Sequence, residues 1–182
     1  MAIGNMNELQ YLDIAGASLS GSIPRQLSNL TKLQSLFLFR NQFTGLIPWE
    51  FSRILPLTNL DLSDNSISEP IPESFAELKN LRLLSLMYNE MNGTVPYGIA
   101  ELPSLVTFDV TYIDLSRNKF TGGIPSDISR SSKLQYFSVS NNPNPELCGA
   151  PLRSCSASMA ILGSKGTGKL RLFLLLSAGQ SK

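Results

Sequence analysis

Residues 33–56 read LQSLFLFRNQFTGLIPWEFSRILP, and residues 57–80 read LTNLDLSDNSISEPIPESFAELKN. Both follow the pattern L-x-x-L-x-L-x-x-N-x-L-x-G-x-I-P-x-x-L-x-x-L-x-x, in which other apolar residues replace some leucines and Glu69 replaces one glycine. The same pattern recurs every 24 residues, and such a fixed period indicates a repeat architecture. The regular units start at Leu9, Leu33, Leu57 and Leu81.

Each unit contains two extended stretches and one short helical stretch. The L-x-x-L-x-L segment alternates near its end, which suits a strand with one buried face. The segment that follows the glycine and enters Ile-Pro is a second extended piece, because proline biases the preceding residue to β or PPII geometry. The x-x-L-x-x-L segment fits one or two turns of α or 3₁₀ helix, too short to be stable alone. The units must therefore stack and share interfaces.

An asparagine occupies the corner after the strand in most units. These residues are Asn41, Asn65, Asn89, Asn118 and Asn142. A buried amide without partners is costly, so we expect each side chain to bond the backbone of a neighbouring turn. Unit one has Ala17 at this position, which predicts a less constrained corner.

The composition excludes several kinds of active site. The 182-residue chain has thirty leucines, two cysteines, no histidine and a formal net charge of +1. Without histidine there is no Ser-His-Asp triad, no Cys-His pair, no imidazole metal site and no imidazole pH switch. Two cysteines do not hold a structural zinc alone, and nucleic-acid binders usually carry a basic excess. We expect no metal, no cofactor, no nucleic-acid partner and no enzymatic activity.

These repeats resemble the extracellular leucine-rich repeats of plants. The resemblance rests on L-x-x-N-x-L/F-S/T-G-x-I-P and on the stretches FLFRN at 37–41 and LMYN at 86–89, and it covers about residues 5–176. It implies an α/β repeat fold, a right-handed leucine-rich repeat solenoid with a parallel concave sheet and short 3₁₀ or helical turns. These two stretches are similar to those in the ectodomains of peptide-hormone receptor-like kinases. That similarity implies an extracellular, plasma-membrane signalling context, with a peptide ligand, a protein co-receptor or both as partners.

We place the solenoid at residues 9–147, after a lead-in of residues 1–8. The lead-in lacks the positive start and apolar run of a signal peptide, and it lacks the paired-cysteine cap of the family. We therefore expect a fragment of a receptor ectodomain. Where the chain itself resides in the cell stays open.

One unit departs from the period. Counting back from Asn118 puts a unit start at Val110, so residues 105–109 are surplus, and the next unit starts at Leu134. The apolar alternation also changes phase between Tyr112 and Ile113. One strand cannot bury both phases, so we expect a bulge or looped-out insert at 105–112. A missing segment of the sequence is the alternative.

The pattern ends in a segment with two prolines and two cysteines. Prolines end regular pairing, and the last unit of a solenoid needs a cover, so residues 148–155 form the expected cap. The arrangement N-P-x-L-C-G-x-P-L-x-x-C resembles the C-terminal cap of the same receptors, which implies a disulfide between Cys148 and Cys155. Two free thiols in a reducing compartment are the alternative.

Residues 156–182 are the expected flexible tail. The apolar stretch at 170–176 is interrupted by Arg171 and resembles the start of a receptor's transmembrane helix. Spanning a membrane takes about 20 apolar residues, so we interpret this stretch as a truncated span. A membrane would be a partner only through that missing or truncated helix.

The stretch GSKGTGK at 163–169 matches the phosphate-loop pattern G-x-x-x-x-G-K. Leu170 stands where the Mg²⁺-binding serine or threonine belongs, and the α/β sheet and acidic metal ligand of such sites do not follow. The Gly, Ser and Lys composition suits a flexible linker. We expect no nucleotide partner.

Positions on either side of the third leucine, and the next position, are predicted to face solvent on the concave side. In units two to four they present Phe37, Phe39, Arg40, Asp61, Asp64, Met87 and Tyr88. Aromatic residues beside an arginine and acids are typical of recognition surfaces, whereas a solvated sheet with scattered aromatics is the alternative. Six strands about 4.8 Å apart would be covered by about eight or nine residues of extended peptide.

The functional hypothesis is a protein- or peptide-binding module that recognises a short extended peptide on its concave face. The alternative is a soluble leucine-rich repeat scaffold, inhibitor or decoy without signalling output. Two N-x-T sequons predict glycosylation at Asn29 and Asn92, although such sequons also arise by chance in repeats of this composition.

Overall fold

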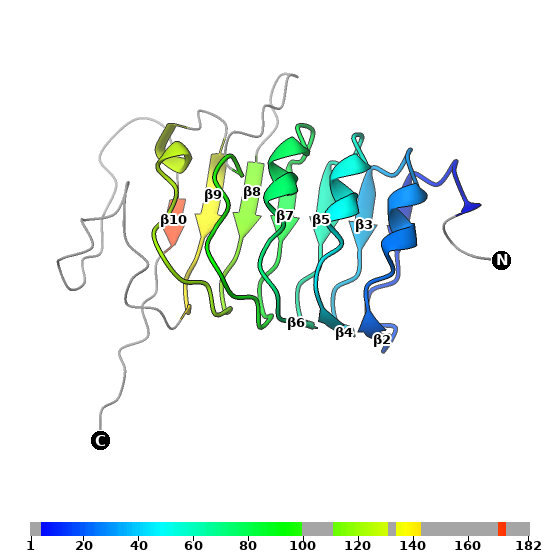
Figure 1. The fold of residues 1–182 in the computed structure, drawn as a ribbon, viewed down its shortest axis with the longest axis horizontal. Helices are drawn as coiled ribbons and strands as arrows, with labels where there is room; N and C mark the ends of the chain where they lie inside the picture. Colours follow the sequence, from blue (N-terminus) through cyan, green and yellow to red (C-terminus); the bar gives the residue numbers. More distant parts are fainter. Residues whose placement is uncertain (1–4, 100–110, 131–133, 143–170, 174–182) are drawn as a thin grey trace.

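The computed structural model describes residues 5–99, 111–130, 134–142 and 171–173. In this part of the chain seven parallel strands form one sheet, in the order β1-β3-β5-β7-β8-β9-β10 (Figure 1). The strands are β1 (Tyr11–Asp13), β3 (Ser35–Phe37), β5 (Asn59–Asp61), β7 (Leu83–Ser85), β8 (Thr111–Asp114), β9 (Leu134–Ser138) and β10 (Arg171–Phe173). The first four of these strands, β1, β3, β5 and β7, come from successive 24-residue units, as the period predicts.

A second, three-stranded parallel sheet lies at the corner after the first. Its strands are β2 (Ser20–Ser22), β4 (Gln42–Gly45) and β6 (Ser66–Ile67). The sequence analysis placed this extended piece after the glycine, whereas β4 ends at Gly45 and β2 continues only one residue past Gly21. Gly45 has a φ of 73°, in the left-handed region. The strand ends there, and the chain then buries Ile47.

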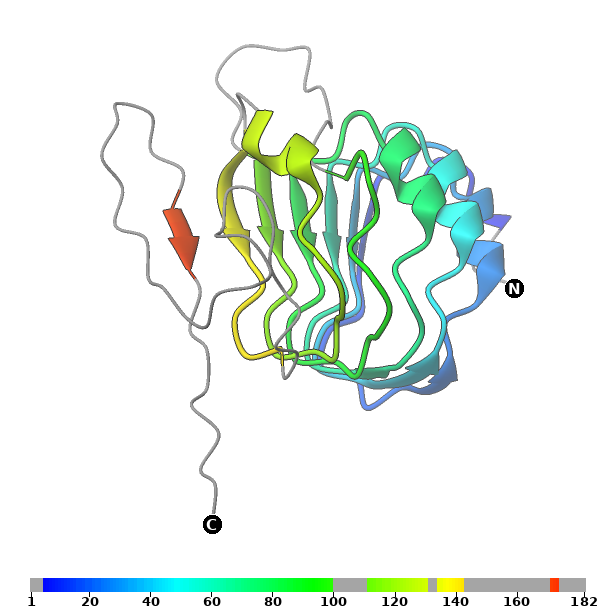
Figure 2. The ribbon, with the colours of Figure 1, turned by 60° about the vertical axis from the view of Figure 1, so that its left-hand side comes forward.

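A 3₁₀ helix begins directly after the proline of each described Ile-Pro dipeptide. These helices are η2 (Arg25–Asn29), η3 (Trp49–Arg53), η4 (Glu73–Glu77) and η5 (Ser126–Arg130). Pro24, Pro48 and Pro72 keep an extended ψ of 120–130°, so the helix starts one residue later. Figure 2 shows the helices on the side of the coil opposite the large sheet. The predicted short helical turns are thus confirmed as 3₁₀.

The hydrophobic core fills the space between the large sheet and the 3₁₀ helices. It is one continuous cluster from Ile23 to Val139, and it contains the fully buried rings of Phe51 and Phe75. In unit one, by contrast, Leu9, Leu12 and Ile14 are only partly buried. Leu27 and Leu30, in η2 and at its C-terminal end, are nevertheless buried in the same unit.

The asparagines form a ladder along the corner. Asn89 is representative: its Nδ2 donates to the carbonyls of Leu62 at 3.0 Å and Leu86 at 3.1 Å, and its Oδ1 accepts from the Ile67 N–H at 3.0 Å. Equivalent bonds join the other four asparagines of this position to the preceding unit. The predicted amide bonds to the neighbouring turn are confirmed. In unit one the Ala17 N–H instead donates to the next unit's asparagine.

Strand β8 pairs out of step with the 24-residue period. Leu84 lies opposite Ile113, which is 29 positions later in the chain. Ile113 and Leu115 are fully buried, whereas Tyr112 is half-buried on the opposite face. The side chains that alternate in step with Ile113 therefore face the core. The register against β9 shifts between Thr111 and Tyr112, inside the segment expected to bulge.

Strand β10 differs from the tail that the sequence predicts. Leu172 lies opposite Phe137 of β9 in a parallel pair, so Arg171–Phe173 is extended and not the first turn of a helix. The edge of a sheet presents unpaired backbone groups that an extended segment can satisfy. Among the described residues, no helix has the length and apolar character to cross a membrane. The predicted cysteine cap at 148–155 and the stretch 163–169 lie outside the described residues.

Candidate recognition site on the concave face

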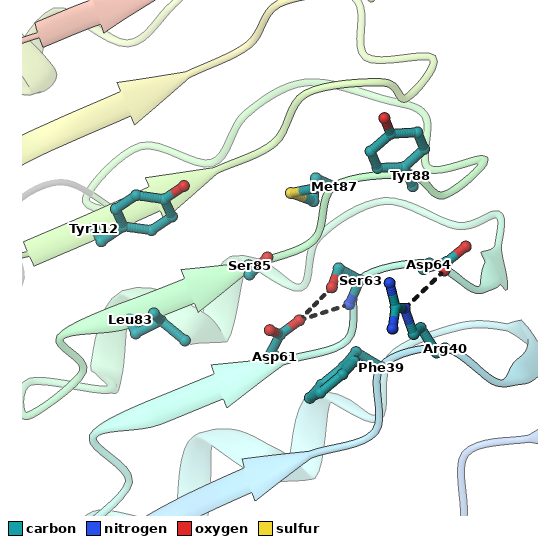
Figure 3. A pocket seen from close by; sticks show the side chains of 10 residues that line it. All are labelled: Phe39, Arg40, Asp61, Ser63, Asp64, Leu83, Ser85, Met87, Tyr88 and Tyr112. Carbon is teal, nitrogen blue, oxygen red and sulfur yellow. Dashed lines mark hydrogen bonds and ion pairs between the residues drawn. The ribbon is translucent and has the colours of Figure 1, made fainter. Parts of the chain in front are cut away.

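A shallow hollow of about 700 Å³ lies on the solvent side of the large sheet, the face predicted to be concave (Figure 3). We call it the concave hollow. It is lined by six of the seven residues that the sequence singled out. These are Phe39, Arg40, Asp61, Asp64, Met87 and Tyr88. They come from three successive units, whose strands β3, β5 and β7 are neighbours in the sheet.

The floor of the hollow consists of small side chains. Ser63 and Ser85 line it and are almost fully buried, at 9% and 6% exposure. Leu83 and Tyr112 line it as well, at the end where the strands begin. The hollow exists because serines stand between larger side chains. The sequence analysis missed these four residues, since it selected large or charged side chains and not the gaps between them.

Asp61 is the last residue of β5 (Figure 3). This strand lies between β3, which Phe39 follows, and β7, which carries Leu83. The Oδ1 of Asp61 accepts hydrogen bonds from the Ser63 N–H at 2.9 Å and from the Ser63 hydroxyl at 2.6 Å. One oxygen of this carboxylate therefore fixes the turn at the end of β5. Among the described residues, no donor reaches its other oxygen, Oδ2.

A row of residues in left-handed backbone conformation borders the hollow. Arg40, Asp64, Tyr88 and Arg117 each have a φ of 55° and precede the ladder asparagine in successive units. Arg40 Nε lies 3.8 Å from Asp64 Oδ2, and the Arg117 guanidinium lies 4.5 Å from the centre of the Tyr88 ring. Bulky residues are uncommon at such φ values, because the side chain crowds the backbone. Large side chains at strained positions support a role beyond folding.

Phe37, the seventh predicted residue, lies beside the hollow and does not line it. Its ring centre is 5.5 Å from that of Tyr11 and 6.5 Å from that of Phe39. Tyr11 is 58% exposed. The three rings form an aromatic cluster on units one and two, at one side of the hollow.

On the other side of the hollow, Tyr112 stacks on Tyr136, with ring centres 4.1 Å apart. Both phenols donate to Asp114 Oδ2, at 3.2 and 3.4 Å. Burial and, second, the charge of Asp114 raise the pKa of Tyr112 well above the ordinary tyrosine value. The sequence analysis did not identify this group. The Tyr-x-Asp spacing at 112–114 was the available signal, because residues two apart on a strand share a face.

The two predicted glycosylation sites are both exposed. Asn29 lies at the end of η2, and Asn92 follows the corner of unit four. The Asn92 Nδ2 donates to the Ser68 carbonyl, so a glycan on this atom would replace that bond. In the described residues no cluster of three His, Cys, Asp or Glu side chains could hold a metal ion.

Comparison with protein families identifies the repeats. The leucine rich repeat family matches residues 8–30, 32–54 and 109–131 in one form and residues 56–112 in another. The chain belongs to the leucine-rich repeat family, in the form found in plant receptor-kinase ectodomains. The second part of that assignment rests on solved structures. Comparison with curated proteins gives no match.

Three solved structures illustrate the likeness of this leucine-rich repeat chain. A TDR receptor is 41% identical with a TM-score of 0.71, over 80% of this chain and 26% of that one. The plant peptide hormone receptor RGFR1 in complex with RGF2 is 33% identical with a TM-score of 0.72, over 78% of this chain and 22% of the receptor. The BIR3–SERK2 complex from Arabidopsis thaliana contains a chain 34% identical with a TM-score of 0.64, over 80% of this chain and 73% of that one.

The chain spans about a quarter of the length of the first two of these structures. Both are named as receptors. One is named as a plant peptide hormone receptor in complex with RGF2, and the third similar structure as the complex of BIR3 with SERK2. The coarse prediction of a peptide-binding leucine-rich repeat module is therefore supported.

Proposed function

We propose that the concave face recognises a short extended peptide that runs across the strands. The concave hollow is the observation that carries this proposal, because it gathers aromatic, charged and small side chains from successive units into one depression. Tyrosine and arginine dominate the energetics of many protein interfaces, and Arg40 and Tyr88 border this one. The likeness to a peptide hormone receptor in complex with its ligand adds support.

The dimensions of the hollow suit a few residues of such a ligand. It extends from the end of β3 to β8, across three gaps between neighbouring strands. At about 4.8 Å per gap this is roughly 14 Å, which about four residues of extended peptide would cover at about 3.3 Å each. A longer peptide would continue over Phe37 and Tyr11, or over Tyr112 and Tyr136.

In its wider setting, we infer that the chain is part of the extracellular region of a plant receptor kinase at the plasma membrane. The proposed solenoid spans residues 9–147 and is followed by the cap at 148–155. The proposal includes a disulfide between Cys148 and Cys155, glycans on Asn29 and Asn92, and a protein co-receptor as second partner. Peptide binding would then be coupled to signalling by recruitment of that co-receptor.

A triple substitution tests the binding surface. The variant Phe39→Ala/Arg40→Ala/Tyr88→Ala removes the arginine and two of the aromatic side chains that line the hollow. We expect it to lose measurable binding of peptides selected on the wild-type chain from a random nine-residue library. The matched control is Trp49→Ala/Arg53→Ala/Tyr97→Ala, which removes two aromatic residues and one arginine from η3 and from the turn after Pro96 in unit four. Trp49 and Tyr97 are 52% and 63% exposed. Unchanged affinity in the first variant, with binding intact in the control, would refute the concave face as the site.

A further inference from the structure

Three aspartates occupy the same position of the repeat, the last residue of β1, β5 and β8. They are Asp13, Asp61 and Asp114. Each uses Oδ1 to accept a hydrogen bond from the backbone N–H two residues later, at 2.9–3.0 Å. This oxygen fixes the turn after the strand in all three units. The second carboxylate oxygen, Oδ2, distinguishes them.

Tyrosine hydroxyls donate to Oδ2 in two of the three units. The Tyr11 hydroxyl lies 3.4 Å from Asp13 Oδ2 on the same strand. The Tyr112 and Tyr136 hydroxyls lie 3.2 and 3.4 Å from Asp114 Oδ2. These carboxylates have internal partners on both oxygens.

Asp61 lacks such a tyrosine. Two residues before it stands Asn59, whose Nδ2 donates to the Ser35 hydroxyl at 3.0 Å and to the Thr58 hydroxyl at 3.1 Å. On the next strand the equivalent residue is Leu83, which has no polar group. Within the described part of the chain, no hydrogen bond reaches Asp61 Oδ2.

The charge of Asp61 is also not offset within the hollow. Among the described residues that line the hollow, Arg40 is the one cation, and its Nε lies 3.8 Å from the carboxylate of Asp64. Leu83 begins β7 and Phe39 follows the end of β3, the two strands on either side of β5, and both line the same hollow. A half-buried carboxylate between apolar side chains attracts a cation more strongly than one in bulk water, because the local dielectric constant is lower.

We propose that Asp61 Oδ2 receives a charge-assisted hydrogen bond from a lysine or arginine side chain of the bound peptide. The aliphatic stem of such a residue would pack on Leu83 and Met87, which line the hollow beside the carboxylate. The ligand would thus supply to unit three the donor that tyrosines supply in units one and five. This inference rests on the proposed function and names the ligand chemistry that the hollow selects.

Peptide selection on the 182-residue chain tests it. A phage library of random nine-residue peptides is selected on the immobilised chain, and the consensus peptide is synthesised with its basic residue and with norleucine in its place. Norleucine keeps the aliphatic stem and removes the charge. Affinities are measured by calorimetry for wild type, Asp61→Asn and Asp13→Asn. Asp13→Asn is the matched control, because it alters the same turn outside the hollow.

We expect one position to be enriched in lysine or arginine. Norleucine there should weaken binding to wild type and Asp13→Asn by about tenfold or more, as loss of a hydrogen bond to a charged group implies, and binding to Asp61→Asn by less than about twofold. Enriched peptides without a basic position, or an equal norleucine effect in all three proteins, would overturn this inference and leave peptide binding intact. Failure to enrich any peptide would reject the proposed function itself. The norleucine comparison in wild type needs no altered protein, so misfolding of a variant cannot decide the result.

Discussion

The asparagine ladder and the concave hollow lie on the same repeats but follow opposite rules. At the ladder, five units place the same residue in the same bonds, with Nδ2 on the preceding unit's carbonyl at 2.9–3.1 Å. On the concave face, equivalent positions hold different residues in each unit, such as Phe39, Ser63 and Met87. The ladder satisfies backbone groups that every stacked unit leaves unpaired. The concave face has no such demand, so its residues are free to serve recognition.

One of the aspartates, Asp61, combines a contact that repeats between units with a position on the variable concave face. Asp61 Oδ1 fixes a turn as the equivalent oxygens of Asp13 and Asp114 do, while no donor from the described part of the chain reaches its Oδ2. An aspartate that recurs at one position of the repeat can therefore hold the turn in each unit that carries it and, in one unit, also offer an oxygen to the hollow. The comparison predicts that substitutions in the ladder reduce stability and that substitutions in the hollow reduce binding.

The largest expected effect is on the ladder. Asn89→Ala removes the acceptor of the Ile67 N–H and the donor to the Leu62 carbonyl, both in a buried corner. Leaving such groups unpaired costs about 1–3 kcal/mol each, so the free energy of unfolding should fall by about 3 kcal/mol in urea titrations followed by circular dichroism. Asn41→Ala is the control, because its Oδ1 serves the exposed N–H groups of Ala17 and Leu19, and it should cost about 1 kcal/mol. Equal costs would show that burial does not set the value of a ladder bond.

Filling the hollow should reduce binding with little loss of stability. Ser85→Phe places a ring over the floor, at a position of the repeat where unit two already carries Phe37. We expect the affinity for a selected peptide to fall by at least about tenfold, because the ring occupies the space of the ligand. Ser85→Ala keeps the hollow open and should bind as wild type does in the same calorimetric measurement. Retained affinity in Ser85→Phe would place the ligand elsewhere.

Relief of the backbone strain at Arg40 should raise stability while it weakens peptide binding. Arg40 has a φ of 55°, which glycine adopts without steric cost, and its side chain is 74% exposed. Arg40→Gly should raise the free energy of unfolding by about 0.5 kcal/mol, the relief of left-handed strain less the entropy cost of glycine, while it weakens peptide binding. Gln42→Gly, in the extended strand β4, should instead lower stability. A stability loss in both variants would argue that Arg40 is retained for folding.

The smallest expected effect is a pH dependence from Tyr112. Its pKa in the folded chain is raised above the ordinary tyrosine value, mainly by burial. The phenol therefore contributes stability below the unfolded-state pKa of about 10, and this contribution is lost as the pH rises above that value. Between about pH 9 and pH 11 wild type should lose stability more steeply than Tyr112→Phe in urea titrations. Parallel curves would show that the phenol titrates equally in both states.

Much of the fold was predictable because the information is local and repeated. The positions of Leu60 and Leu84 in the period predicted their burial and their register, and the x-x-L-x-x-L segment after each Ile-Pro predicted a short helical turn. The second sheet was predicted a few residues too late. Proline restricts only the residue before it, whereas β4 is extended because the Gln42 N–H bonds the Leu19 carbonyl of the previous unit.

The candidate site was predictable in part. The concave columns identified Phe39, Asp61 and Tyr88, because alternation along a strand shows which side chains leave the core. Comparison of equivalent positions between units did not reveal that serines at 63 and 85 open a hollow, or that Tyr112 stacks on Tyr136. Both depend on which side chains become neighbours across strands.

The sequence by itself determined the period, the buried faces, the ladder and the set of residues available to the concave face, since each of these follows from positions within one unit. The tertiary structure decided which of those residues meet. Tyr112 lies beside Leu83 because the pairing of β7 with β8 advances 29 positions and not 24, a register that no single unit contains. Asp61 differs from Asp114 for the same reason: the two turns are alike, and only the side chains on their own and adjacent strands determine whether the second oxygen has a donor.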